Sequence, residues 1–266
     1  MPPWSAALWG LWSATEECLR AHSSNLDRDS SQVSSSKEQL TRMVTAFGEM
    51  LPLAVGIAIS PTTIISTVLV LLSPKAKTRS VALLVGCVVG IAVTVAFFAF
   101  LSSLLPLPAS SRTAPATGAI LVAVGVLLLV LAVRQWQNRP AEGERAELPK
   151  WMAGIDSITQ AKALALGILL STASPKNLLL ALSAGVIVGG AVLSVGEVAV
   201  LIVLFTVIAA STVAVPVVAY LVAPSRMTGP LAALREWLVD NSASIMVVLL
   251  LMIGVVVIGN GIASFD

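Results

Sequence analysis

The sequence predicts an all-α integral membrane protein with six transmembrane helices, arranged as two inverted three-helix repeats in which helices 1 and 4 are broken at proline. Three observations support this. The 266-residue chain is 57% hydrophobic and only 11% charged, whereas a soluble domain carries about 25% charged residues. Six apolar runs could each cross a hydrocarbon layer about 30 Å thick, which takes about 20 helical residues. A Ser-Pro pair lies near the centre of the first and the fourth run.

The six apolar runs share a length that suits one helical crossing. They are 51–72, 81–105, 117–136, 163–188, 198–222 and 244–262. The strands of a membrane barrel would alternate apolar and polar residues over about ten positions. Continuous stretches such as ILVAVGVLLLVLAV in the third run do not alternate. We therefore predict that all six spans are helices.

The segment 1–42 differs from everything after it. It is polar, rich in serine and contains His22, the single histidine, and such a segment buries too little apolar surface to fold alone. We predict a disordered tail, with translation that begins near Met43 as the open alternative. The rest of the chain then comprises a first three-helix repeat at 43–136, a cytoplasmic loop at 137–162 and a second three-helix repeat at 163–266.

Basic residues gather in alternate connections. The connections after the first, third and fifth runs, together with the residues beside them, hold Lys75, Lys77, Arg79, Arg134, Arg139, Arg145, Lys150, Lys162, Arg226 and Arg235. By the positive-inside rule these connections face the cytoplasm, and both ends of the membrane domain face outward from the plasma (inner) membrane. Trp136, Trp151 and Trp237 lie beside the same connections, as interfacial anchors would. The tail disagrees with this orientation, since it places Arg20, Arg28, Lys37 and Arg42 on the outer side.

Sequence signatures of enzymes are missing from the chain. Cys18 and Cys87 form neither a disulfide framework nor a metal-spaced cluster. We find no Gly-rich phosphate loop, no Walker lysine motif and no serine elbow. The net charge of +2 provides no basic surface for nucleic acid. We expect no enzymatic activity, no cofactor, no metal and no nucleic-acid partner.

The Ser60-Pro61 and Ser174-Pro175 pairs lie at corresponding depths in the first and fourth runs. Each proline removes one backbone donor, so each helix should kink or break there. The freed backbone must be satisfied by protein or by water in a cavity. Two inverted triplets with a broken first helix are typical of secondary transporters, whose site lies at the repeat interface. Two alternatives stay open: re-entrant half-helices, and prolines that carry no function.

Lys176 lies in the middle of the fourth run, about 21 Å from Lys162 and about 18 Å from Val188 at 1.5 Å per residue. A side chain that reaches about 6 Å cannot snorkel to either interface. A central lysine costs about 2.5 to 3.5 kcal/mol on insertion scales, and neither Glu49 nor Glu197 comes within reach. We interpret Lys176 as a ligand for an anionic head group, beside the donor-rich start of a half-helix at Asn177. Structural packing that neutralises the lysine is the alternative.

The candidate substrate-binding residues are those around the two Ser-Pro pairs: Ser60, Pro61, Thr62, Ser174, Pro175, Lys176 and Asn177. We predict no catalytic and no metal-binding residue. Two other features indicate packing. The Gly86/Gly90 and Gly185/Gly189 spacings allow helices to approach closely. We expect most hydroxyl side chains of the spans to bond to their own helices, although they could line a path: Ser66, Thr67, Thr94, Thr206, Ser211 and Thr212.

Three stretches resemble the signature regions of one family. They read LPLAVGIAISPTTIISTVLVLLSPKAKTRSVALLVGCVVG, AKALALGILLSTASPKNLLLALSAG and LREWLVDNSASIMVVLLLMIGVVVIGNGI. In this order, from about Glu49 to Ile262, they resemble the GAP-like family of glycopeptidolipid-addressing and sulfolipid-addressing proteins, within the lysine exporter superfamily. The departures are Ser174 where the family has asparagine, Ser-Pro where amino-acid exporters have Pro-Gly-Pro, and Cys87 where tryptophan is expected.

The resemblance implies a small membrane protein that assists export of envelope glycolipids. We expect a transporter or translocation factor that exports an envelope (glyco)lipid across the plasma membrane, with membrane lipids and an anionic or glycolipid substrate as its partners. One alternative is an exporter of amino acids or small metabolites. The other is a membrane scaffold for lipid-synthesis or export machinery that transports nothing. A homodimer, or a complex with a partner exporter or synthase, is compatible with each.

Overall fold

The computed structural model describes residues 32–33, 35–73, 75–104, 115–139, 158–191 and 193–265. The chain divides into two compact units, Met1–Val44 and Thr45–Asp266. Within the described residues the regular structure is entirely helical. The predictions for the tail before residue 32, for the loop residues 140–157 and for Trp151 fall outside these ranges.

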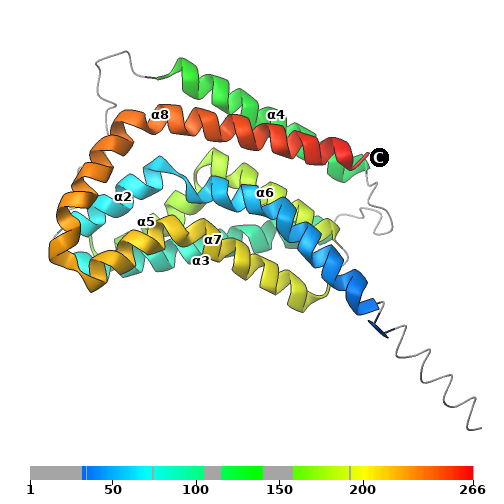
Figure 1. The fold of residues 1–266 in the computed structure, drawn as a ribbon, viewed down its shortest axis with the longest axis horizontal. Coiled ribbons are helices and arrows are strands. Elements are labelled where there is room, and N and C mark those ends of the chain that lie inside the picture. Colours follow the sequence, from blue (N-terminus) through cyan, green and yellow to red (C-terminus); the bar gives the residue numbers. More distant parts are fainter. Residues whose placement is uncertain are drawn as a thin grey trace, which may run out of the picture. The chain divides into compact units, whose positions relative to one another are not determined.

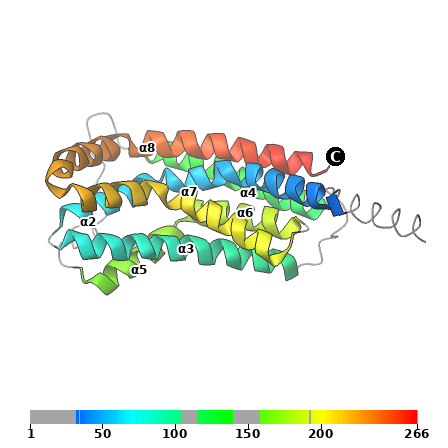
Figure 2. The same ribbon diagram turned by 60° about the horizontal axis from the view of Figure 1, so that its bottom comes forward.

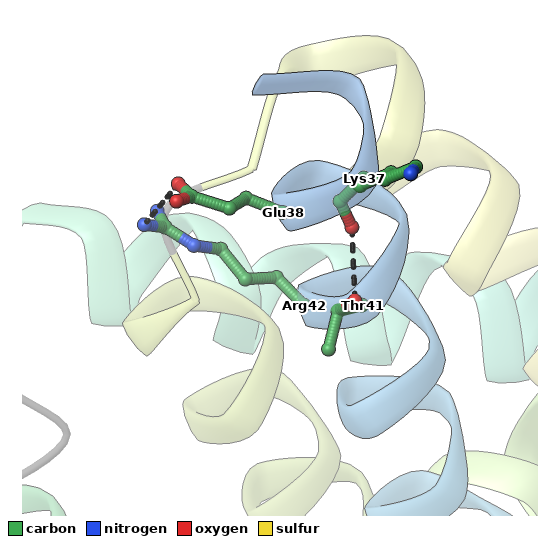
Figure 3. Close-up of polar contacts among 4 residues, drawn as sticks. All are labelled: Lys37, Glu38, Thr41 and Arg42. Atoms are coloured by element: carbon green, nitrogen blue, oxygen red, sulfur yellow. Dashed lines mark hydrogen bonds and ion pairs between the residues drawn. The ribbon is translucent and has the colours of Figure 1, made fainter. Parts of the chain in front are cut away.

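The described part of the first unit is the beginning of a helix, Ser35–Ala58. Figure 3 shows two neighbouring contacts, each between residues four positions apart: Arg42 Nη2 lies 3.9 Å from Glu38 Oε2, and Thr41 Oγ1 donates a hydrogen bond of 2.9 Å to the Lys37 carbonyl. These four side chains are exposed. Residues 35–42 are thus helical where the sequence predicts a disordered tail. A local contact favours this helix, since an ion pair between residues four apart, such as Glu38 with Arg42, supports helical structure.

Seven further helices are found among the described residues of the second unit. They are α2 (Pro61–Leu72), α3 (Ala76–Leu104), α4 (Pro115–Gln137), α5 (Gln160–Thr172), α6 (Pro175–Gly190), α7 (Val195–Val222) and α8 (Pro224–Ala263). Five of the described helices are long and apolar enough to cross a membrane, namely Ser35–Ala58, α3, α4, α7 and α8, and the bent pair of α5 and α6 would make a sixth. The prediction of an all-α, multi-pass membrane protein is confirmed at this level.

The outer surface of these helices is apolar. Large hydrophobic side chains that point outward include Val93, Phe97 and Phe100 of α3, Val203, Val207 and Val215 of α7, and Met252 and Val255 of α8. Each of them is more than half exposed. A soluble protein rarely shows such a continuous apolar surface. These helices are therefore surrounded by lipid.

The helix α8 begins at Pro224, well before the predicted run 244–262, so the connection predicted there is helical. Leu231 and Leu238 explain the difference. Leu231 is buried in a cluster with Val213 and Val217 of α7 and with side chains of α2 and α3. Leu238 is buried in a second cluster with residues of α2 and α3. Apolar residues seven apart on one face hold this charged segment against the bundle.

Close helix crossings are made at glycines. The helix α3 packs against α5, α6 and α7, and a Cβ atom on Gly86 would collide with the Leu164 carbonyl of α5. On α6, a Cβ on Gly189 would lie 2.7 Å from Ser102 Oγ of α3, and one on Gly185 would lie 2.5 Å from Phe98 Cβ of the same helix α3. The predicted packing role of the Gly86/Gly90 and Gly185/Gly189 spacings is confirmed.

A further glycine seam joins α4 to α8, which lie side by side in Figures 1 and 2. A Cβ on Gly118 would lie 2.8 Å from the Gly261 carbonyl oxygen, and one on Gly125 would lie 2.9 Å from that of Gly254. The pairs are spaced seven residues apart on both helices. We did not predict this seam from the sequence, although the matching spacings were visible there.

Candidate functional site

The first chain break of the site separates the helix Ser35–Ala58 from α2. Pro61 opens α2 and has no N–H to donate to the Ile57 carbonyl. The Ser60 N–H turns back to the Ala58 carbonyl at 2.9 Å instead of reaching Gly56. The carbonyl groups of Gly56 and Ile57 therefore lose their helical donors.

The second break separates α5 from α6, whose axes bend by 67° between Thr172 and Pro175. Pro175 has no N–H to donate to the Ser171 carbonyl. The Leu170 carbonyl, one residue earlier, accepts a hydrogen bond of 3.2 Å from Asn177 Nδ2. A side chain in the first turn of α6 thus satisfies a carbonyl near the end of α5.

Lys176 links the second break to the first. Its Nζ atom donates a hydrogen bond of 2.8 Å to the Gly56 carbonyl, and the side chain is 3% exposed. No ion pair of Lys176 is found in the described ranges. Glu197 lies in the first turn of α7, where its Oε2 accepts from Ser194 N at 2.7 Å as part of a capping box.

Gly56 lies where side chains of two other helices close in on the main chain. A Cβ atom there would collide with Ile253 of α8 and lie 3.0 Å from Leu180 Cδ1 of α6. The side chains of two helices therefore close over the main chain of the first break. The Lys176 ammonium group meets a bare carbonyl inside this packing.

Thr212 of α7 gives a second contact to the first break. Its Oγ1 donates a hydrogen bond of 2.6 Å to the Ala58 carbonyl. The other hydroxyl groups that the sequence singled out bond within their own helices: Ser66, Thr67, Thr94, Thr206 and Ser211. The prediction for hydroxyl side chains is confirmed for these five, and Thr212 is the exception. Nothing in the sequence distinguishes Thr212 from its neighbours.

The remaining predicted site residues divide into two groups. Ser60 and Pro61 are buried at the first break, whereas the Thr62 side chain is exposed. At the second break Ser174 is half-buried and Pro175 is exposed. The structure brings Lys176 to the main chain of the first break and Asn177 to that of the second. It turns Thr62 and Pro175 outward.

The start of α6 is rich in unpaired hydrogen-bonding groups. An ammonium group has three donors, and one of those on Lys176 has a partner among the described residues. Ser174 provides no side-chain cap for α6. Asn177 is buried, and its Oδ1 has no partner within the described part of the chain. Positive charge and open N–H groups at a helix start are suited to an anion. The residues that the structure describes contain no group of three or more acidic, cysteine or histidine side chains that could hold a metal ion.

The model of one protein family matches most of this chain. The match to "Sap, sulfolipid-1-addressing protein" covers residues 50–263, and so includes both breaks and the helices α2 to α8. The resemblance to the sulfolipid-addressing proteins is thereby confirmed, while the lysine exporter superfamily stays a prediction. Neither a curated protein nor a solved structure matches the chain significantly.

Proposed function

Because the chain belongs to the sulfolipid-1-addressing protein family, we propose that it is a transporter or translocation factor that moves an anionic envelope lipid across the plasma membrane. The observation that carries this proposal is the position of Lys176. Its ammonium group lies inside an apolar bundle, on the main chain of one break and at the start of the helix after the other. Charged groups inside membrane bundles are costly and usually serve a ligand or ion pathway.

In this proposal the helices form two inverted triplets, each of which begins with a helix broken at Pro61 or Pro175. The contacts between elements support it. The helix α4 packs on α6 and α8 packs on α2, while α4 with α8 and α3 with α7 form pairs of their own. These four contacts are unchanged when the halves are exchanged, whereas the contacts of α2 with α3 and of α7 with α8 have no counterpart of similar extent among the described residues. Such repeats allow alternating access around a site at their interface.

The Lys176 ammonium group exchanges partners during transport. When the anionic group of a lipid arrives at the start of α6, it competes with the Gly56 carbonyl for the ammonium N–H groups. The Gly56 carbonyl is then free, and the first break can rearrange against α6 and α8. Binding of the head group at one break thus changes the geometry of the other, and the acyl tails remain in the bilayer. No covalent step is required.

The basic ends of the helices face the cytoplasm in this account. The Arg139 guanidinium group stacks on Trp136 at 3.8 Å from the ring centre, at the end of α4. Trp237 in α8 is 56% exposed. Exposed tryptophan beside arginine suits a membrane interface, and the positive-inside rule assigns that interface to the cytoplasmic side.

The proposal is tested by lipid profiling in a deletion strain that carries the wild-type gene, Lys176→Met or Lys162→Met. Lys162 is the matched control, since it is exposed in the first turn of α5. We expect Lys176→Met to lower the amount of one lipid in the outer envelope by at least about tenfold, a factor that corresponds to 1.4 kcal/mol. The amount of the same lipid in the cell interior should rise. Lys162→Met should behave as wild type. If the Lys176→Met protein is as abundant as wild type and the lipid is still fully exported, the alternative of a membrane scaffold that transports nothing is favoured instead.

A further inference from the structure

Arg235 lies on the face of α8 that packs against the bundle. It comes four residues after Leu231 and three before Leu238, so the three side chains share one side of the helix. Both leucines are buried, and each belongs to an apolar cluster with residues of α2 and α3. The half-buried Arg235 side chain is thus placed between two apolar clusters.

The guanidinium group of Arg235 has no polar partner in the described part of the chain. Its Nε atom is buried and makes no hydrogen bond. No ion pair or hydrogen bond of its other nitrogen atoms occurs among the described residues. An arginine side chain stays charged in proteins, and a buried charged donor without an acceptor is unfavourable. Such a group indicates an anionic ligand.

The first part of α8 lies at the edge of the membrane. The helix has 40 residues, which is about 60 Å at 1.5 Å per residue and about twice the thickness of the hydrocarbon layer. In Figure 1 its first part, drawn in orange, runs in a different direction from the second part, which lies alongside α4. The neighbours Leu234 and Trp237 are 38% and 56% exposed. Exposed apolar and aromatic side chains beside arginine are typical of a segment at the level of the lipid head groups.

We infer that Arg235 binds a phosphate group at the membrane surface. The Nε atom and one Nη atom of a guanidinium group form a fork that fits two oxygen atoms of one phosphate, and Nε of Arg235 is the donor that lacks an acceptor. We expect a phospholipid as the source, because the exposed Leu234 and Trp237 side chains can enter the acyl region beside the head group. The inference goes beyond the proposed transport, since this lipid is a resident partner and not the cargo.

The bound phosphate stabilises the packing of the first part of α8. Leu231 and Leu238 attach this part to α2 and α3. An unneutralised charge between the two clusters opposes that attachment, because burial of an unpaired charge costs free energy. A ligand that binds only the folded protein raises its stability. Phospholipid should therefore raise the unfolding temperature of the protein.

The test uses the full chain in detergent and three probes. They are dioleoyl phosphatidylglycerol, dioleoylglycerol, which lacks the phosphate, and inorganic phosphate. Dissociation constants are measured by native mass spectrometry, and unfolding temperatures are measured with and without each probe. The variants are Arg235→Gln, Arg235→Lys and the matched control Arg226→Gln, which removes the same charge from an exposed position of the same helix.

We expect wild type to have a saturable site for the phospholipid, with an affinity at least about tenfold higher than that of Arg235→Gln. Arg235→Lys keeps the charge but loses the fork, so its affinity should lie between the two. Arg226→Gln should bind as wild type does, and dioleoylglycerol should show no saturable binding. The phospholipid should raise the unfolding temperature of wild type and Arg226→Gln, and much less that of Arg235→Gln.

Three results would overturn the inference: no saturable phospholipid site in wild type, equal affinity in wild type and Arg235→Gln, or an equal loss of affinity in Arg226→Gln. The last would show a general effect of charge. If Arg235→Gln does not accumulate in the membrane, Arg235→Lys replaces it in the comparison, and wild-type affinity in that variant would likewise overturn the inference.

Inorganic phosphate distinguishes the two sources of the ligand. It should compete only weakly with the phospholipid. Competition at the same concentration as the lipid would support the phosphate site and assign it to a soluble ligand. Lys176→Met should bind the phospholipid as wild type does, since Lys176 contacts the main chain of the first break. Failure of this inference and failure of the proposed transport can therefore be told apart.

Discussion

At the scale of single residues, the candidate site is a set of main-chain carbonyl groups beside the two breaks at Pro61 and Pro175. Gly56 and Ala58 receive donors from Lys176 and Thr212, and Leu170 receives one from Asn177. All three donors lie in α6 and α7. Carbonyl groups inside a bilayer need such partners, because no bulk water can replace them. The first break is thus held by side chains of the other half of the molecule.

Gly56→Ala tests the closeness of this packing. The added methyl group would collide with Ile253 and press on Leu180, and overpacking of this kind typically costs about 1 to 3 kcal/mol. We expect a lower thermal unfolding temperature of the protein in nanodiscs. Gly48→Ala is the control, since no atom lies within 4 Å of its added Cβ. Equal unfolding temperatures for the two variants would contradict the described packing.

Thr212→Val tests the second contact to the first break. The substitution keeps the shape of the side chain and removes the donor to the Ala58 carbonyl, a loss of about 1 kcal/mol or more for a bond in a dry interior. Export should fall together with stability. Thr206→Val, which removes only a bond to Ile202 of the same helix, should leave both nearly unchanged. The same loss in both variants would show that the contact across helices has no special role.

At the scale of elements, the helices are held together by glycine seams and a few buried clusters. Gly86 and Gly167 bring α3 and α5 into main-chain contact, and Gly118, Gly125, Gly254 and Gly261 do the same for α4 and α8. Packing of small residues replaces the hydrophobic effect as the source of cohesion, because lipid tails are as apolar as the side chains. Seams of this kind fix which helices are neighbours.

Gly167→Val is the sharpest test of a seam. Its Cβ would meet the Leu83 carbonyl and lie 2.9 Å from the Cys87 nitrogen, and neither main-chain group can move aside easily. We expect a large loss of folded protein in the membrane, measured by fluorescence-detected size exclusion. A Cβ atom on Gly259 of α8 would meet nothing within 4 Å, so Gly259→Val should retain a wild-type profile. Equal yields would indicate that α3 and α5 do not cross at Gly167.

The sequence predicted the kind of each element better than its ends. Apolar run length identified the helices, because the bilayer sets a minimum length. It missed the starts of Ser35–Ala58 and α8. The first depends on pairs such as Glu38 with Arg42, and the second on burial of Leu231 and Leu238. Neither signal is contained in overall hydropathy.

At the scale of the whole molecule, sequence reasoning named residues at both breaks but not the groups that they contact. Proline chemistry and the cost of a buried lysine identified Pro61, Pro175 and Lys176. The partner of Lys176, Gly56, lies 120 positions away and has no side chain that could mark it. Thr62 and Pro175 face outward because successive residues of a helix point about 100° apart, so only part of each first turn faces the bundle.

Orientation in the membrane is a prediction at the same scale. Lys77→Cys at the start of α3 and Val195→Cys at the start of α7 are both at exposed positions. In spheroplasts an impermeant maleimide should label Val195→Cys at once, and Lys77→Cys only after lysis. Cys18 is replaced by serine in both, while Cys87 is buried and can remain. The reverse pattern would invert the proposed topology.

The central claim is that Lys176 binds the anionic head group of a lipid that the protein moves. The most direct measurement is the flux of a fluorescent galactosylceramide 3-sulfate across proteoliposomes that contain wild type, Lys176→Met or Lys162→Met. The account predicts sulfate-dependent flux for wild type and Lys162→Met, and at least about a tenfold loss for Lys176→Met. Equal flux for all three proteins would contradict it, because Lys176 would then serve only to hold the Gly56 carbonyl.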